Sequence, residues 1–281
     1  MTDKSLAELI APLPPEDQAE LERARALLES PGLAVQLANV IGAPIESLMR
    51  GLPGPASRLV DKAARKAVEV AFEAARRTLR DDSPADASLR LHQAAVAGTG
   101  AVGGFFGLPG LLVELPVTTA TMLRSIADIA RSEGAAPGEP GTRLDCLQVL
   151  ALGGTRPDDD GAESGYFATR AALAQQVTAA TRYVAGGMGS GSAPAIVQLV
   201  NGIASRFSIP VTQKALAQAT PLVGAATGAT LNLIFMRHFQ AAARGHFIVR
   251  RLERKHGPDR IRGAYVHAVP AEPSAGIAPK R

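Results

Sequence analysis

Two long stretches of this chain contain no charged side chain. They cover residues 91–113 and 215–236, which are 23 and 22 positions without Lys, Arg, Asp or Glu. A helix of this length is long enough to cross a bilayer. Glycine and proline interrupt both stretches, however, and the Gly-Leu-Pro-Gly segment at 107–110 predicts a turn near the end of the first. The mean hydropathy of the whole chain is only +0.08. The two stretches therefore favour a re-entrant or interfacial helical hairpin, or a tightly packed soluble core, over a simple span.

Several glycines in these stretches recur four residues apart. This spacing places them on one face of a helix, where the missing side chains let a second backbone approach closely. Such a face suits contact between helices in a membrane, and it suits tight packing in a soluble bundle equally well. The residues predicted to serve membrane contact or helix packing are Gly100, Gly103, Gly104, Phe105, Phe106, Gly107, Pro109, Gly224 and Gly228.

The composition predicts helices. Hydrophobic residues make up 46% of the 281 positions, but aromatic residues only 4%, and Trp is absent. An alanine-rich chain with few aromatic or β-branched runs favours helices over a β-sandwich or a barrel. The single cysteine, Cys146, excludes an internal disulfide. The predicted fold is therefore all-α, a multi-helix bundle with glycine-rich apolar helical hairpins.

We expect one main helical domain over residues 33–262. An N-terminal helix and linker precede it at residues 1–32, and a disordered tail follows it at residues 263–281. Along the chain, hydrophobic periodicity, proline and glycine place the individual helices. Helices are expected at 16–29, 33–41, 44–51, 55–80, 111–131, 143–152, 163–184 and from about 230 to 256.

Several segments of the chain resemble motifs of the EcsC family. They are residues 103–110 (GGFFGLPG) followed by 114–119 (ELPVTT), then 163–168 (ESGYFA), then Gln213–Lys214 before Pro221, then 235–247 with FMRHF and GHF at its ends. The family is named for a gene beside the two components of an ABC transporter in some bacteria. The resemblance implies an all-helical, bacterial, membrane-associated accessory protein, and it supplies no catalytic residue.

Two polar residues stand at the ends of the uncharged stretches, Glu114 after the first and Lys214 before the second. If the helices pack antiparallel, these residues could form an ion pair that fixes both hairpins at one depth. Separate solvation of each is the alternative, because a buried charge needs a partner.

Two histidines, His238 and His246, are eight residues apart and project within about 80° of each other on a helix. Without a third ligand they make a poor metal site, so helix capping or a surface position is expected for them. A G-x-G-x-x-G match at 98–103 lacks the strand that a dinucleotide fold requires. We predict no catalytic, cofactor-binding or metal-binding residue.

The region 237–262 carries eight Lys or Arg residues and two acids. Its basic side chains follow an apolar segment, an order that an anionic cytoplasmic leaflet attracts. The scarcity of aromatic residues and the lack of a binding motif count against nucleic acid as a partner. The predicted contacts to anionic lipid are Arg244, Arg250, Arg251, Arg254 and Lys255.

The sequence therefore predicts a non-enzymatic accessory protein of the EcsC type that acts with an ABC transporter. Residues 1–20 do not form a signal peptide, because acids and prolines interrupt any apolar segment, so the protein is expected on the cytoplasmic side of the inner membrane. The alternative is a soluble helical protein with a pocket for a lipid or a small molecule, with hydrolysis left open.

Overall fold

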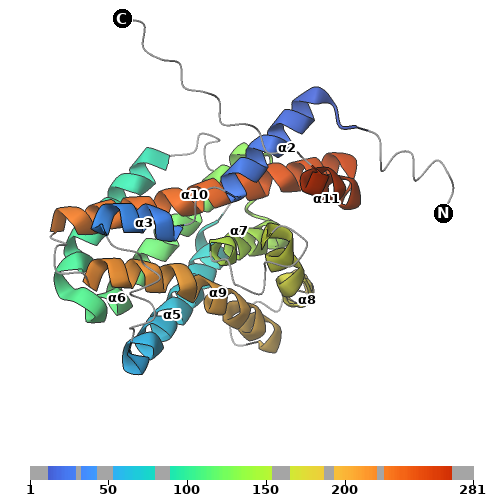
Figure 1. The fold of residues 1–281 in the computed structure, drawn as a ribbon. Coiled ribbons are helices and arrows are strands. Elements are labelled where there is room, and N and C mark those ends of the chain that lie inside the picture. Colours follow the sequence, from blue (N-terminus) through green and yellow to red (C-terminus); the bar gives the residue numbers. More distant parts are fainter. Residues whose placement is uncertain are drawn as a thin grey trace, which may run out of the picture.

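The computed structural model of the chain describes residues 12–29, 33–42, 53–79, 89–153, 165–186, 193–219 and 225–267. Throughout these residues the regular structure is helical, which confirms the predicted all-α class. The expected helix at 44–51 and residues 268–281 of the expected tail lie outside the described residues. The helices are α2 (Pro15–Leu28), α3 (Leu33–Ile41), α5 (Gly54–Thr78), α6 (Leu89–Ser132), α7 (Pro140–Leu152), α8 (Gly165–Ala185), α9 (Pro194–Ala219), α10 (Ala225–His256) and α11 (Pro258–His267) (Figure 1).

Helix α6 doubles back on itself. His92 near its start and Asp128 near its end share a hydrogen bond of 2.9 Å between Nε2 and Oδ2. In a straight helix, 36 residues would separate the two by about 54 Å. The chain must therefore reverse near residue 110, and in Figure 1 the two arms join at the left.

The glycine-rich segment thus lies at a hairpin, but its backbone differs from the expected one. The sequence placed a turn at 107–110, whereas the backbone stays helical through Pro109. The side chains of residues 98–109 and all of Gly224 are outside the described part of the structure. Gly228 is described, and it is buried in the first turns of α10.

Helices α9 and α10 form a second antiparallel pair. The Phe207 ring lies 5.6 Å from that of Phe239, and Lys214 Nζ lies 5.2 Å from the Phe235 ring. Residue numbers therefore increase along α9 in the direction in which they decrease along α10, so the two helices are antiparallel. The second uncharged stretch is divided between the end of α9 and the start of α10, so it is no single helix.

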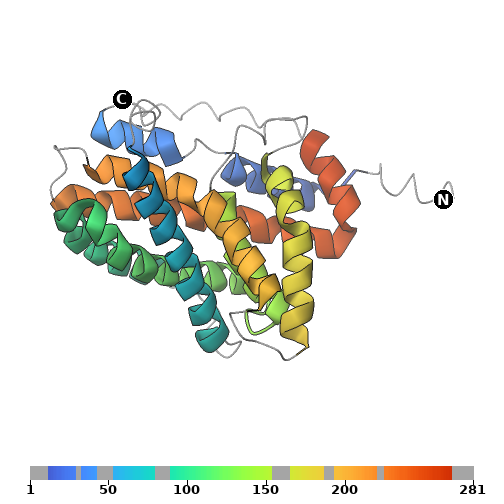
Figure 2. The same ribbon diagram turned by 90° about the horizontal axis from the view of Figure 1, so that it is seen from below.

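Both hairpins reverse at the same end of the molecule. Figures 1 and 2 show the reversal of α6, the end of α9 and the start of α10 together, with α3 beside them. Gln240 of α10 ties the two arms of α6 together, because its side chain accepts from Gln93 at 2.7 Å and donates to Ser125 at 2.8 Å. We call residues 98–117, 214–219 and 225–235 the hairpin pole.

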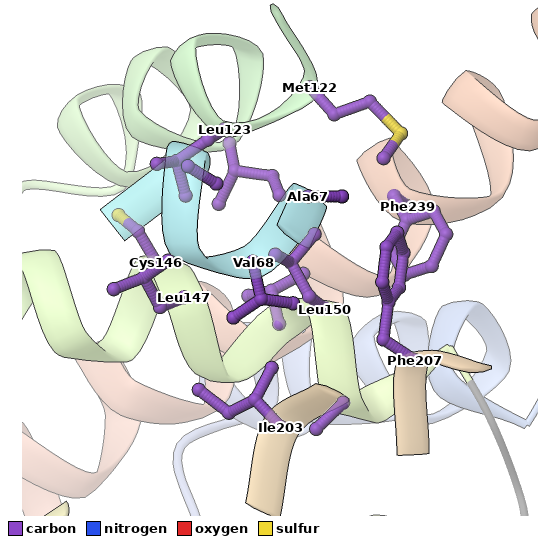
Figure 3. Packing of buried hydrophobic residues seen from close by; sticks show 14 of the residues in the cluster. Ala67, Val68, Met122, Leu123, Cys146, Leu147, Leu150, Ile203, Phe207 and Phe239 are labelled. Carbon is purple, nitrogen blue, oxygen red and sulfur yellow. The ribbon is translucent and has the colours of Figure 1, made fainter. Parts of the chain in front are cut away.

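The main core lies where α5 crosses the other long helices. One face of α5 is fully buried and consists of small residues such as Ala67 and Val68, which let neighbouring helices come close. Figure 3 shows these side chains against Met122 of α6, Leu147 of α7 and Phe207 of α9. This packing explains the alanine-rich composition, since small side chains allow many helices to share one core.

Helix α2 is packed onto α10 at the other end of the molecule. Leu21 and Ala24 of α2 are fully buried. Gly245 permits the close approach, because a Cβ built there would lie 2.9 Å from the Ala24 carbonyl oxygen. Beyond α10, Gly257 adopts a φ of +89° and Pro258 begins α11. The expectation of a disordered tail from residue 263 is therefore wrong for residues 263–267, which are helical.

Candidate functional site

Of the two alternatives for Glu114 and Lys214, the ion pair between the two hairpins is the one present. Lys214 Nζ donates to Glu114 Oε1 at 2.7 Å, and the two side chains are 0% and 4% exposed. The alternative of separate solvation is therefore excluded for this pair. The partners come from α9 and from the second arm of α6, which the antiparallel hairpins bring to the same level.

Further contacts complete the surroundings of this ion pair. Gln218, one turn along α9, donates to Glu114 Oε2 at 3.5 Å. Lys214 Nζ also lies 5.2 Å from the centre of the Phe235 ring, within the range of a cation–π contact. Burial lowers the pKa of Lys214, and the Glu114 carboxylate opposes that shift. Both charges are thus satisfied inside the protein.

The two histidines lie in separate places, and the expected capping or surface position is wrong for His246, which is fully buried. His238 Nε2 donates to the Gly153 carbonyl oxygen at 3.1 Å, so it holds the end of α7. His246 Nδ1 lies 3.0 Å from the Tyr166 hydroxyl of α8. Burial lowers the pKa of His238 and lowers that of His246 well below its ordinary value. Both rings are therefore neutral at pH 7.

The histidines also form no metal centre with their neighbours. Among the residues that the structure describes, no group of three His, Cys, Asp or Glu side chains is arranged to hold a metal ion.

A network of charged residues extends from His246, and the sequence analysis missed most of it. Arg170 donates to the Tyr166 hydroxyl at 3.3 Å and to both oxygens of Glu253 at 2.6 and 3.0 Å. Arg250 donates to Glu253 at 3.2 Å and to Asp145 at 3.0 and 3.1 Å. The network joins α7, α8 and α10. Burial raises the pKa of Asp145, although Arg250 opposes the shift.

An open cavity of about 330 Å³ lies over this network. Its walls come from α7, α8, α10 and α11. The resemblance had singled out the segment that holds Tyr166, but no signal in the sequence linked it to Asp145 or Arg262. The cavity is lined by Asp145, Gln148, Phe167, Arg170, Ala171, Ala174, Val177, Thr178, Arg250, Glu253, Pro258, Asp259 and Arg262.

The basic region of α10 is not the bare cationic face that the sequence suggested. Arg250 belongs to the network above. Arg251 pairs with Glu20 at 2.7 Å and Glu133 at 3.2 Å.

Lys255 completes this pairing, because it binds Asp17 of α2 at 2.8 Å. Arg244 is half-buried, and Arg254 is exposed, with one donor 3.4 Å from the Glu133 carbonyl oxygen. Acids of α2 and of the core thus neutralise three of the five expected lipid contacts.

Within the described residues, no helix has an uninterrupted segment apolar enough to cross a bilayer.

Comparison with known proteins gives one match. The sequence model of the EcsC protein family matches residues 18–252, which reach from α2 to α10 and include the Glu114–Lys214 pair and both histidines. No curated protein matches the chain, and no solved structure does. Because the match covers most of the chain, this protein belongs to the EcsC family.

Proposed function

We propose that this protein is a non-enzymatic accessory protein that docks on the cytoplasmic face of the bacterial inner membrane through its hairpin pole. One observation carries the proposal. Glu114 and Lys214 are the only charged residues in the sequence of the hairpin pole, and they neutralise each other in a buried pair. This end of the molecule can therefore approach the headgroup region of a bilayer without the cost of stripping water from an unpaired charge.

Exposed apolar side chains beside the reversal of α6 support this orientation. Val113 is 75% exposed and Val117 is 52% exposed. Their spacing of four residues places them on one face of the helix. Arg124 follows about two turns later and is exposed. Apolar side chains followed by a basic one suit a helix that lies in the membrane interface.

Helix α3 adds to the same end of the molecule. It lies beside the hairpins in both views of the fold (Figures 1 and 2). Its Val35 and Val40 are 51% and 39% exposed, and the helix carries no charged residue. An uncharged helix with exposed valines enlarges the apolar surface that a bilayer would cover.

A membrane partner fits the same placement. A protein docked by one end keeps the other end, with α2, α8 and α11, free for a second contact. We propose an ABC transporter as that partner, because the family takes its name from a gene beside one. Anionic lipid would contribute through the exposed Arg124, because Arg250, Arg251, Arg254 and Lys255 lie near the other end of α10.

Flotation with liposomes tests the docking. We expect the wild-type protein to float with vesicles that contain anionic lipid, and the variant with both Val113→Asp and Val117→Asp to lose most of this binding. Val197→Asp is the matched control, because Val197 is 38% exposed and lies about 25 Å along α9 from Lys214. Absence of flotation with neutral and anionic vesicles at every salt concentration contradicts the proposal. An equal loss in the control contradicts it too.

A second candidate function rests on the cavity of about 330 Å³. This volume is at the lower end of the range found for small-molecule sites. A pocket for a small ligand is compatible with membrane docking, because the cavity and the hairpin pole lie at different ends of the protein.

A further inference from the structure

The cavity between α7, α8, α10 and α11 has a charged floor whose geometry is fixed. Asp145, Arg250, Glu253 and Arg170 follow one another through contacts of 3.0, 3.2 and 2.6 Å. The Glu253 side chain is only 5% exposed, and both of its oxygens are occupied by guanidinium groups. A ligand therefore meets charges that are already held in position, which lowers the entropy cost of binding.

The α7 wall has hydrogen-bonding capacity that the described residues do not use. Arg250 occupies Oδ2 of Asp145, while Oδ1 has no hydrogen-bond partner in this part of the chain. Gln148, one turn later on the same face of α7, lines the cavity and is only 5% exposed. Its carboxamide also has no hydrogen-bond partner within the described residues. These two polar side chains line the cavity, so they are placed to receive a donor from a ligand.

An ammonium group is the donor that fits the α7 wall best. It carries several N–H groups, which can bind Asp145 Oδ1 and the Gln148 carbonyl oxygen together. Its positive charge also offsets the burial that raises the pKa of Asp145.

The opposite wall, formed by α8 and α11, presents guanidinium groups. Arg170 and Arg262 both lie over the ring of Phe167, at 5.5 and 5.9 Å from its centre. Arg262 is exposed at the rim of the cavity. Guanidinium groups bind carboxylate and phosphate oxygens in preference to other partners. Asp259, one turn before Arg262, lines the same wall and disfavours a ligand with a large negative charge.

We propose that this cavity binds a small zwitterion, with its primary ammonium group at Asp145 and Gln148 and its anionic group at the Arg170–Arg262 side. The cavity is lined by three arginines and three carboxylates, so a zwitterion of small net charge matches its balance. The zwitterion can be a free compound or the headgroup of a phospholipid. This site lies apart from the hairpin pole, and soluble probes reach it without a membrane.

Calorimetric titration of the full chain tests the site with three probes. They are O-phosphoethanolamine, phosphocholine and inorganic phosphate. Phosphocholine keeps the anion but its quaternary ammonium has no N–H to donate, so we expect it to bind at least about tenfold more weakly than phosphoethanolamine. Equal binding of the three probes means that the anion alone is recognised, and it overturns the proposal. No binding of phosphoethanolamine at millimolar concentration overturns it as well.

Variants locate the site. Asp145→Asn and Gln148→Leu should each weaken the binding of phosphoethanolamine by about tenfold or more. Gln198→Leu, an exposed glutamine on α9, is the control and should leave it unchanged. Unchanged binding in both cavity variants, with folding verified by thermal unfolding, also overturns the proposal. If a cavity variant does not fold, the comparison of the three probes on the wild-type protein still tests whether the ammonium group is recognised.

The source of the zwitterion is settled by a second arm with vesicles. If vesicles of phosphatidylethanolamine compete with the soluble probe, and compete less for the Gln148→Leu variant, the ligand is a lipid headgroup. Binding of the soluble probe without such competition indicates a free compound. Both results keep the proposed chemistry of the site.

Discussion

Lys214 donates to Glu114 across the space between α9 and α6, and neither side chain is more than 4% exposed. The two residues are 100 positions apart in the chain. Their contact holds the second arm of one hairpin to the end of the other, so it links the two uncharged stretches directly.

Removal of one partner of this pair should be costly. We expect Lys214→Met alone, or Glu114→Leu alone, to destabilise the fold by about 3–5 kcal/mol, because either change leaves an unpaired buried charge. The double variant removes both charges, and we expect it to be considerably more stable than either single variant. Urea unfolding of the four proteins gives the coupling energy. Additive losses in the double variant would show that the two charges do not stabilise each other.

Acid should destabilise the protein through His246. Burial places the pKa of this ring in the folded state well below its ordinary value of 6.5, so the unfolded chain binds the proton more readily. The contribution of the neutral His246 ring to the free energy of unfolding is therefore fully present above pH 6.5. It is lost as the pH falls below 6.5 towards the lowered pKa.

The test of this linkage replaces the ring with a group that does not titrate. His246→Asn keeps an acceptor for the Tyr166 hydroxyl. We expect its free energy of unfolding to fall less steeply between pH 6.5 and about 5 than that of the wild-type protein. Parallel curves for the two proteins contradict this assignment.

Gly245 should tolerate no side chain. A Cβ at this position would lie 2.6 Å from Leu28 Cγ and 2.9 Å from the Ala24 carbonyl oxygen, and the backbone oxygen cannot move freely. We expect Gly245→Ala to destabilise the protein by about 1–3 kcal/mol and to speed hydrogen exchange in α2.

Gly263 in α11 is the matched control for this change. A Cβ there would have no atom within 4 Å. Because alanine favours a helix over glycine, Gly263→Ala should stabilise the protein by up to about 1 kcal/mol. Similar effects at both positions would contradict the close approach of α2 to α10.

The basic residues of α10 should differ sharply in their response to charge reversal. Arg250→Glu places a third carboxylate beside Asp145 and Glu253, so we expect a loss of at least about 2 kcal/mol in the free energy of unfolding. Arg254→Glu changes an exposed side chain, and we expect a change within about 0.5 kcal/mol. Thermal unfolding of the two variants measures this difference in stability. Equal stabilities would contradict the network around Arg250.

The sequence alone predicted the helical class, and it left the Glu114–Lys214 pair as one of two alternatives beside separate solvation. The pair was a candidate because its members stand at matching ends of two uncharged stretches. The reversal of α6 was located correctly near Gly110, but its backbone was not. Local propensity marks Pro109 as a break, whereas the backbone of the segment is helical in the structure.

The charge pairing of α10 could not be predicted from the sequence. Arg251 finds its partner Glu20 at a distance of 231 positions, and Arg250 finds Asp145 at 105 positions. No periodicity within one helix reveals such partners, because they depend on how α2 and α7 pack against α10. For the same reason Arg170 and Asp145 were absent from the candidate residues, and the cavity that they line was not foreseen.

The most direct test of membrane docking measures which end of the protein enters the bilayer. Cys146 is the only cysteine and is fully buried, so a Cys146→Ser background allows a single fluorescent label at an introduced cysteine. Labels at Val113→Cys and Val197→Cys then report on the hairpin pole and on the opposite end of α9. With anionic vesicles that contain a lipid-borne quencher, we expect strong quenching at position 113 and little at position 197. Equal quenching at the two positions, or none at 113, would contradict docking through the hairpin pole.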